Sequence, residues 1–145
     1  MSTKLVIGLD GQSSGERALE FGAQLAEQIG SCELLVVYVI EWSPYSFQTA
    51  EENAQRHKRR EEEISTARER VVDPAIAQLE KQGLSVTGMV RHGDVADTLN
   101  AVAKADGAAQ IVIARSTDKS LSKRIFGSST ATLVMEASVP VTVVS

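Results

Sequence analysis

Basic and hydroxyl side chains gather in the segment Arg115–Gly127, near the C-terminal end of the sequence. Its basic residues are Arg115, Lys119, Lys123 and Arg124. With one acid, Asp118, the segment has a net charge of +3 in a chain whose net charge is -4. It runs into Gly127-Ser128, the predicted start of a helix, where free amides and the helix dipole favour an anion. These features predict a phosphate site, with a solvated basic loop as the alternative.

The carboxylate of Asp10 is the second candidate for ligand binding, because it directly follows the first apolar run of the chain. There it can accept hydrogen bonds from the amino or hydroxyl groups of a ligand. The sequence DGQSS, which begins at Asp10, would serve equally well as a turn and a helix cap. The sequence leaves both interpretations open.

Residues typical of catalysis are scarce. The chain contains neither a G-x-x-x-x-G-K-S/T loop nor a G-x-G-x-x-G fingerprint, which argues against a P-loop hydrolase and a dinucleotide dehydrogenase. His57 falls in a charged segment, and His92 follows the third apolar run, where no spacing assigns a nucleophile to it. Cys32 is the single cysteine, and no Cys or His spacing suits zinc. We therefore expect no catalytic residue and no metal site.

Five short apolar runs predict the strands that would position these residues. They are Lys4–Leu9, Leu34–Ile40, Leu84–Val90, Gln110–Ala114 and Pro140–Val144. Most are continuously apolar, as in strands that are covered on both faces, and helical patterns separate them. This alternation predicts an α/β fold with a parallel sheet. Ligands of such sheets bind beyond the carboxyl ends of the strands, so we expect Asp10, the segment after Ile40 and the loop after Ala114 to line one site.

Proline and aspartate residues predict where two of the helices begin. The charged segment 50–82 contains Pro74, where we expect a kink or a restart with Asp73 as its cap. A later helix over 95–104 should have Asp94 as its N-cap.

The composition limits the classes of protein that the chain can belong to. Its 145 residues, 43% hydrophobic and 23% charged, suit one globular domain. The net charge of -4 argues against a nucleic-acid partner. No apolar run approaches the roughly 18 residues of a membrane span, and the N-terminus lacks the pattern of a signal peptide. We expect a cytoplasmic protein.

Four segments give the whole chain a resemblance to the universal stress proteins of the UspA type. They are VIGLDGQSSGERALEFGAQLA, LLVVYVI, VRHGDVADTLNAVA and RIFGSSTATLVMEASVPVTVVS. The last is the most specific, because Gly-Ser, a helix, a small residue and Val-Pro-Val close the domain of this family. The resemblance implies one domain over residues 1–145, with a five-stranded parallel sheet in the order 3-2-1-4-5 and helices on both faces.

The resemblance also implies an adenine nucleotide site across the ends of the first and fourth strands. Asp10 matches the acid that meets the adenine, and Val39 lies near the position that borders the base. A loop patterned G-x2-G-x9-G-S/T holds ribose and phosphates in nucleotide-binding members. The matching residues here are Ala114, Arg115, Ser116, Thr117, Gly127, Ser128 and Ser129. ATP or AMP is the implied ligand, with Mg²⁺ only beside ATP.

Two glycines of that loop pattern are replaced in this chain. Ala114 adds only a methyl group, whereas the β-branched Thr117 resists a positive φ and keeps the backbone from approaching a phosphate closely. Family members that lack the glycines tend not to retain ATP. The nucleotide is therefore one alternative, and an interaction module with an empty cleft is another.

The C-terminal strand, VPVTVVS, would lie at a sheet edge, and the resemblance implies that a homodimer forms there. Protection of this edge by Pro140 and by helix packing is the alternative. We expect a stress-response protein that acts through dimerisation and adenine-nucleotide occupancy, without turnover, and with a regulatory partner that the sequence does not identify. A slow ATPase in the same cleft would have Asp118 and His92 as its nearby candidates for a base.

Overall fold

The computed structural model describes residues 2–11, 13–41, 50–115 and 126–145. The strands are β1 (Thr3–Leu9), β2 (Cys32–Glu41), β3 (Ser85–Gly93), β4 (Gln110–Ala114) and β5 (Val141–Val144). The helices are α1 (Ser13–Ile29), α2 (Ala50–Ala67), α3 (Asp73–Glu80), α4 (Val95–Asp106) and α5 (Phe126–Glu136). A five-residue π-helix, η1 (Arg68–Val72), joins α2 to α3.

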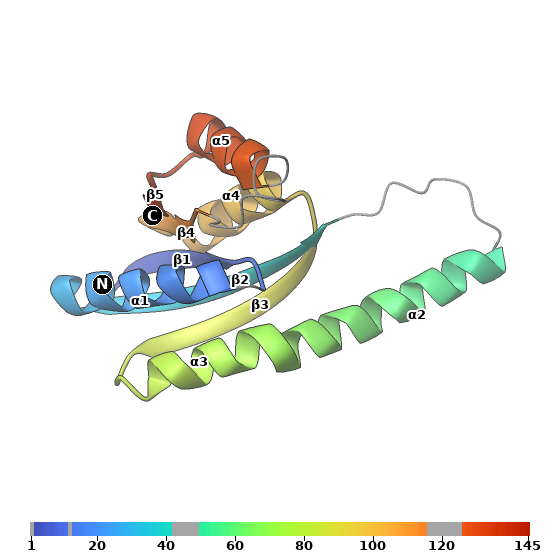
Figure 1. The fold of residues 1–145 in the computed structure, drawn as a ribbon, viewed down its shortest axis with the longest axis horizontal. Helices are drawn as coiled ribbons and strands as arrows, with labels where there is room; N and C mark the ends of the chain where they lie inside the picture. Colours follow the sequence, from blue (N-terminus) through green and yellow to red (C-terminus); the bar gives the residue numbers. More distant parts are fainter. Residues whose placement is uncertain (1, 12, 42–49, 116–125) are drawn as a thin grey trace.

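The five strands form one parallel sheet in the order β3-β2-β1-β4-β5 (Figure 1). This is the order that the resemblance implied. From β1 the chain builds outward through β2 to β3, and then crosses back to place β4 on the other side of β1. The strand order therefore reverses between β1 and β4, where doubly wound sheets bind their ligands.

Helices cover both faces of the sheet, as predicted. One face carries α1, η1 and α3, and its core includes Leu5, Ile7 and Leu79. The other carries α4 and α5, and its core includes Val6 and Leu133. Val6 and Ile7 are neighbours in β1 and both are fully buried, which explains why the strand is continuously apolar.

The chain passes Pro74 without a break, so the prediction that Asp73 caps a new helix is wrong. Asp73 has helical angles (φ -61°, ψ -42°), and α3 continues directly from η1. Proline is tolerated in the first turn after the π-helix, where the wider turn relieves its clash with the preceding carbonyl. Asp73 pairs instead with Arg68, with 3.7 Å between Oδ1 and Nε.

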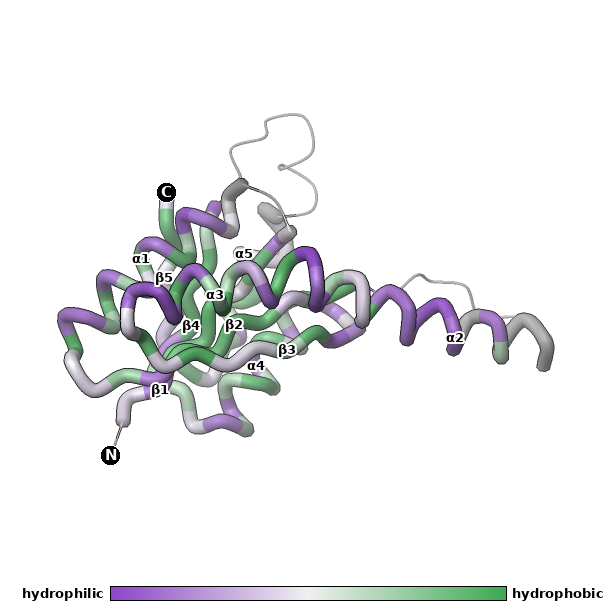
Figure 2. Tube along the Cα trace, turned by 90° about the horizontal axis from the view of Figure 1, so that it is seen from below, coloured by the Kyte–Doolittle hydropathy of each residue, from purple (hydrophilic) through white to green (hydrophobic). Residues whose placement is uncertain are grey.

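The N-terminal part of α2 projects beyond the sheet (Figures 1 and 2). Most of its described residues are hydrophilic, in contrast to the apolar strands of the sheet (Figure 2). Only its last turns approach β3, where Ile64 and Ala67 pack on the first face. The position of α2 leaves a groove between the helix and the edge strand β3.

The start of α4 follows the prediction. The side chain of Asp94 accepts a hydrogen bond from the Asp97 amide at 3.0 Å, as an N-cap does. The helix extends two residues further than predicted, to Asp106, and ends at Gly107, whose φ of 67° is readily adopted only by glycine.

Candidate functional site

The carboxylate of Asp10 lies at the carboxyl end of β1, against the start of α1. Its Oδ1 accepts a hydrogen bond from the amide of Gly15 at 3.1 Å. A Cβ atom at position 15 would stand 3.0 Å from the same oxygen, so glycine is what lets the carboxylate approach the helix this closely. The turn itself is made by Gly11, with a φ of 75°. The capping interpretation of Asp10 is therefore correct, and the residue also lines a cleft.

This cleft lies between the ends of β1 and β4 and the helices α4 and α5. Its enclosed volume is about 30 Å³, and the volume is about 410 Å³ when the open solvent at its mouth is included. It is lined by Gly8, Leu9, Asp10, Gly15, Val95, Leu99, Ile113, Ala114, Ser129, Thr130 and Leu133. Most of the described lining is apolar, and its polar side chains are Asp10, directly after β1, and Ser129 and Thr130 of α5. An apolar group with a polar edge would suit this lining.

The structure brings three of the predicted site residues together in the cleft: Asp10, Ala114 and Ser129. Val39 is buried near the end of β2 in the core beneath α4, and it is not among the described residues of the lining. Ala114 is the last residue of β4 and is buried, so its methyl group occupies space that the glycine of the loop pattern would leave open.

Backbone contacts on two sides fix the first residue after β4. The amide of Arg115 donates to the carbonyl of Val144 in β5 at 2.7 Å. Its carbonyl accepts a hydrogen bond from the guanidinium of Arg17 in α1. The contact of Arg17 with this loop was not predicted from the sequence, because an arginine on a partly exposed helix surface gives no signal of a partner 98 residues away. It adds a cation beside the segment that was already predicted to be basic.

Beyond Arg115, the structure describes only the last part of the predicted phosphate loop. Ser116 and Thr117 lie outside the described residues, as do Asp118, Lys119, Lys123 and Arg124. Gly127 and Ser128 belong to the first turn of α5, which begins one residue earlier than predicted, at Phe126.

Neither histidine lines the cleft. His57 is exposed on α2 and lies 3.2 Å from Glu61. His92 pairs across from β3 to Glu63, with 3.1 Å between Nε2 and Oε2, and it lines the groove beside α2 instead. Within the described ranges, no cluster of His, Cys, Asp or Glu could hold a metal ion, and no helix is long and apolar enough to cross a membrane.

The fold and the cleft define a doubly wound α/β protein with a small hollow at the reversal of strand order. The family model of the universal stress protein family matches residues 1–145, and the chain belongs to this family. No curated protein matches the sequence.

Solved structures of the same family have the same fold. The universal stress protein UspA from Lactobacillus plantarum is 17% identical with a TM-score of 0.81, over 99% of this chain and 97% of that one. A universal stress protein in complex with cAMP is 18% identical with a TM-score of 0.67, over 99% and 96%. A family member from Arabidopsis thaliana with AMP bound is 14% identical with a TM-score of 0.66, over 98% and 90%. At these identities the likeness establishes the fold alone.

Proposed function

We propose that this chain is a cytoplasmic, homodimeric stress-response protein that binds an adenine nucleotide in the cleft between β1 and β4, without turning it over. The observation that carries the proposal is the convergence of Asp10, Ala114 and Ser129 on one apolar hollow at the reversal of strand order. Two structurally similar family members, one with AMP bound and one in complex with cAMP, support an adenine nucleotide as the ligand.

Each part of the cleft has a role in this proposal. Asp10 accepts a hydrogen bond from the adenine amino group, and the side chains of Leu99, Ile113 and Leu133 contact the base. Val39 supports this wall from the core. Ribose and phosphate extend toward the first turn of α5, whose amides and dipole favour an anion. The residues proposed to bind the phosphate are those that match the loop pattern of the family: Arg115, Ser116, Thr117, Gly127, Ser128 and Ser129.

The two replaced glycines favour a nucleotide with few phosphates. The methyl group of Ala114 lines the cleft directly, and a threonine at position 117 opposes the backbone conformation that glycine would allow. AMP needs fewer contacts with this loop than ATP, so we propose AMP as the better ligand. Mg²⁺ would accompany ATP only.

Analysis of the nucleotide content of the purified protein tests the proposal. Freshly purified protein is denatured, the released small molecules are identified by mass spectrometry, and AMP and ATP with Mg²⁺ are then titrated by calorimetry. Asp10→Asn should weaken AMP binding by roughly tenfold or more, the loss expected for a hydrogen bond to a charged group. Asp106→Asn, which changes an acid paired with Lys4 away from the cleft, is the matched control. If no nucleotide is released and no heat appears at millimolar AMP or ATP, the cleft serves another purpose and the chain is an interaction module.

The homodimer belongs to the same proposal, and we place its contact at the edge strand β5. The order of the sheet leaves one edge of β5 without a neighbouring strand in the described chain. Val143 in this strand is 40% exposed, and Val134 and Met135 of α5 are 53% and 83% exposed. An open strand edge beside exposed apolar side chains favours pairing with a second copy.

A further inference from the structure

An arginine of α1 contacts the backbone of the first residue after β4. The guanidinium of Arg17 donates a hydrogen bond from Nη2 to the carbonyl oxygen of Arg115. Each partner has a close sequence neighbour in the nucleotide cleft, because Gly15 of α1 and Ala114 of β4 belong to the lining. Arg17 and Arg115 themselves are not among the described lining residues. The contact therefore lies beside the cleft and links two of the elements that form it.

The packing of α1 on the sheet sets the position of Arg17. The helix lies against both β1 and β4. The next two residues, Ala18 and Leu19, are buried in the core of this face, whereas the preceding Glu16 is exposed. Arg17 is half-buried between them, at the border of the packed surface. A side chain in this second turn of α1 can therefore reach the end of β4 from a fixed base.

Both backbone groups of Arg115 are engaged within the protein. Its amide donates to the carbonyl of Val144 at 2.7 Å, which continues the pairing of β4 with β5 one residue beyond Ala114. Its carbonyl is held by Arg17 on the side of α1. The two contacts fix the direction in which the chain leaves the sheet. They also leave the side chain of Arg115, which is exposed, as the part of this residue that can bind a ligand.

We propose that Arg17 is a positioning residue for the phosphate of the bound nucleotide. It acts through Arg115, the first residue of the phosphate loop, by holding its carbonyl toward α1 before the nucleotide binds. A segment that is already held in place binds more tightly, because binding then carries a smaller cost in conformational entropy. This inference rests on the proposed function, in which Arg115 binds the phosphate.

Arginine suits this role because its guanidinium stays charged at every pH at which the protein is folded, and it presents several donors in a fixed plane. A hydrogen bond from a charged donor is also stronger than one between neutral groups. The role concerns the phosphate alone, since the base is bound by Asp10 and the apolar walls of the cleft in the proposed function. Loss of Arg17 should therefore affect AMP and spare adenosine.

Calorimetric titration of AMP and of adenosine tests this difference. Arg17→Met removes the charge and the donors and keeps an unbranched side chain. Its affinity for AMP should fall roughly three- to tenfold, less than for the direct loss of a charged hydrogen bond because the effect passes through Arg115. Its affinity for adenosine should change by less than about twofold. Arg17→Lys keeps a charged donor and should recover most of the affinity for AMP.

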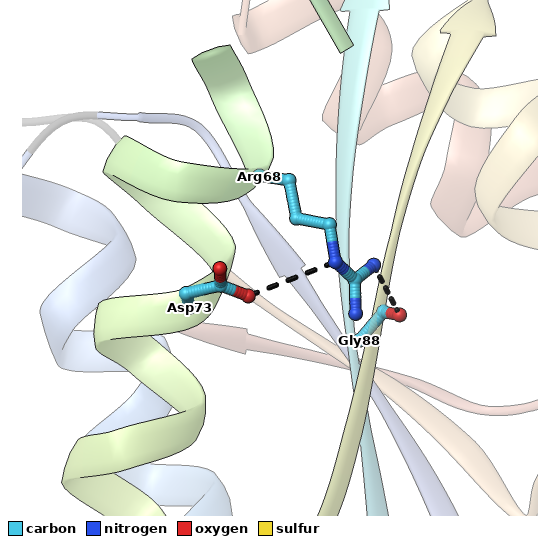
Figure 3. Close-up of polar contacts among 3 residues, drawn as sticks. All are labelled: Arg68, Asp73 and Gly88. Atoms are coloured by element: carbon cyan, nitrogen blue, oxygen red, sulfur yellow. Dashed lines mark hydrogen bonds and ion pairs between the residues drawn. The ribbon is translucent and has the colours of Figure 1, made fainter. Parts of the chain in front are cut away.

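Arg68 offers a matched control, because it makes the same kind of contact away from the cleft. Its Nη1 donates to the carbonyl of Gly88 in β3 at 3.1 Å, and its Nε pairs with Asp73 (Figure 3). Arg68→Met thus removes an arginine and a contact between a helix and a strand, as Arg17→Met does. Neither η1 nor β3 contributes to the described lining of the cleft. Both affinities should therefore stay within about twofold of the wild-type values.

The carbonyl carbon of Arg115 reports the contact directly and without nucleotide. In the isotopically labelled protein its chemical shift should change in Arg17→Met. It should stay close to the wild-type value in Arg17→Lys and in Arg68→Met. Melting temperatures of all variants verify that they fold.

The positioning role is wrong if Arg17→Met binds AMP like the wild-type protein, or if it loses affinity for AMP and adenosine equally. It is also wrong if Arg17→Lys recovers the affinity for AMP but not the carbonyl shift, because the charge alone would then explain the effect. A wild-type protein that binds neither AMP nor adenosine would contradict the proposed function itself, and the role of Arg17 would fall with it.

Discussion

The contact between η1 and β3 should make Gly88→Ala one of the most damaging single-methyl changes in this chain. A Cβ atom at position 88 would lie 2.4 Å from Cγ1 of Val72 and 2.8 Å from Cδ1 of Ile76. Carbon atoms in contact normally lie about 3.5–4.0 Å apart, so η1 must move by about 1 Å or more. Val72 is fully buried and cannot turn aside into solvent.

The expected loss in the free energy of unfolding is about 2–3 kcal/mol, the upper part of the range for overpacking in a core. Val72→Ala alone should cost about 2–3 kcal/mol through lost burial and a cavity. In the double variant the new methyl group fills part of that cavity. The combined loss should therefore fall below the sum of the two single losses by roughly 1 kcal/mol or more, as happens for residues in contact.

Urea unfolding monitored by far-UV circular dichroism measures these differences. Thr87→Ala, at an exposed neighbour of Gly88 in β3, is the control and should change stability by less than about 1 kcal/mol. Additive losses in the double variant, or a loss for Gly88→Ala as small as that of the control, would refute the reasoning. Because Arg68 belongs to η1, the same shift should also weaken its bond to the Gly88 carbonyl.

Three further predictions concern the cap of α4, the edge of β5 and the lone thiol. Asp94→Ala should lower the free energy of unfolding by about 1 kcal/mol, because it removes the acceptor for the Asp97 amide; unchanged urea unfolding would contradict this. Val143→Lys places a charge on the β5 edge and should give monomers in sedimentation velocity; an unchanged dimer would place the contact elsewhere. Burial, and secondarily the charge of Glu33, raises the pKa of the Cys32 thiol. At about pH 8 the fraction of Cys32 present as thiolate should therefore be smaller in the folded protein than in the urea-unfolded protein, so alkylation of the folded protein should be slower. Glu33→Gln should speed alkylation of the folded protein. Equal alkylation rates for the folded and unfolded protein would argue against the raised pKa.

The strands and their order could be predicted because each depends on a local or family-wide pattern. The run Leu5–Ile7 is apolar without alternation, and the structure buries all of it between two helical layers. Asp94 was recognisable as a cap from its position before an apolar helix. The place of Asp10 at the carboxyl end of β1 followed from the parallel sheet alone.

The parts that could not be predicted depend on contacts between distant segments or on backbone detail. The hydrogen bond from Arg17 to the carbonyl of Arg115 joins two residues whose sequence neighbourhoods give no hint of each other. The π-helix before Pro74 was not predicted, and a kink or a restart was expected instead, because the sequence shows the proline but not the wider turn that accommodates it.

The two-layer core has a consequence for the order in which a growing chain can bury its apolar surface. The first 93 residues contain β1, β2, β3 and every helix of the face that carries α1, η1 and α3. The opposite side of the same strands, with Val6, Leu35 and Val37, packs against α4, β4 and α5 and cannot be covered before Leu133 has been synthesised. A nascent or truncated chain that ends before α5 thus exposes the apolar surface of its central strands, the kind of surface that chaperones bind and that drives aggregation.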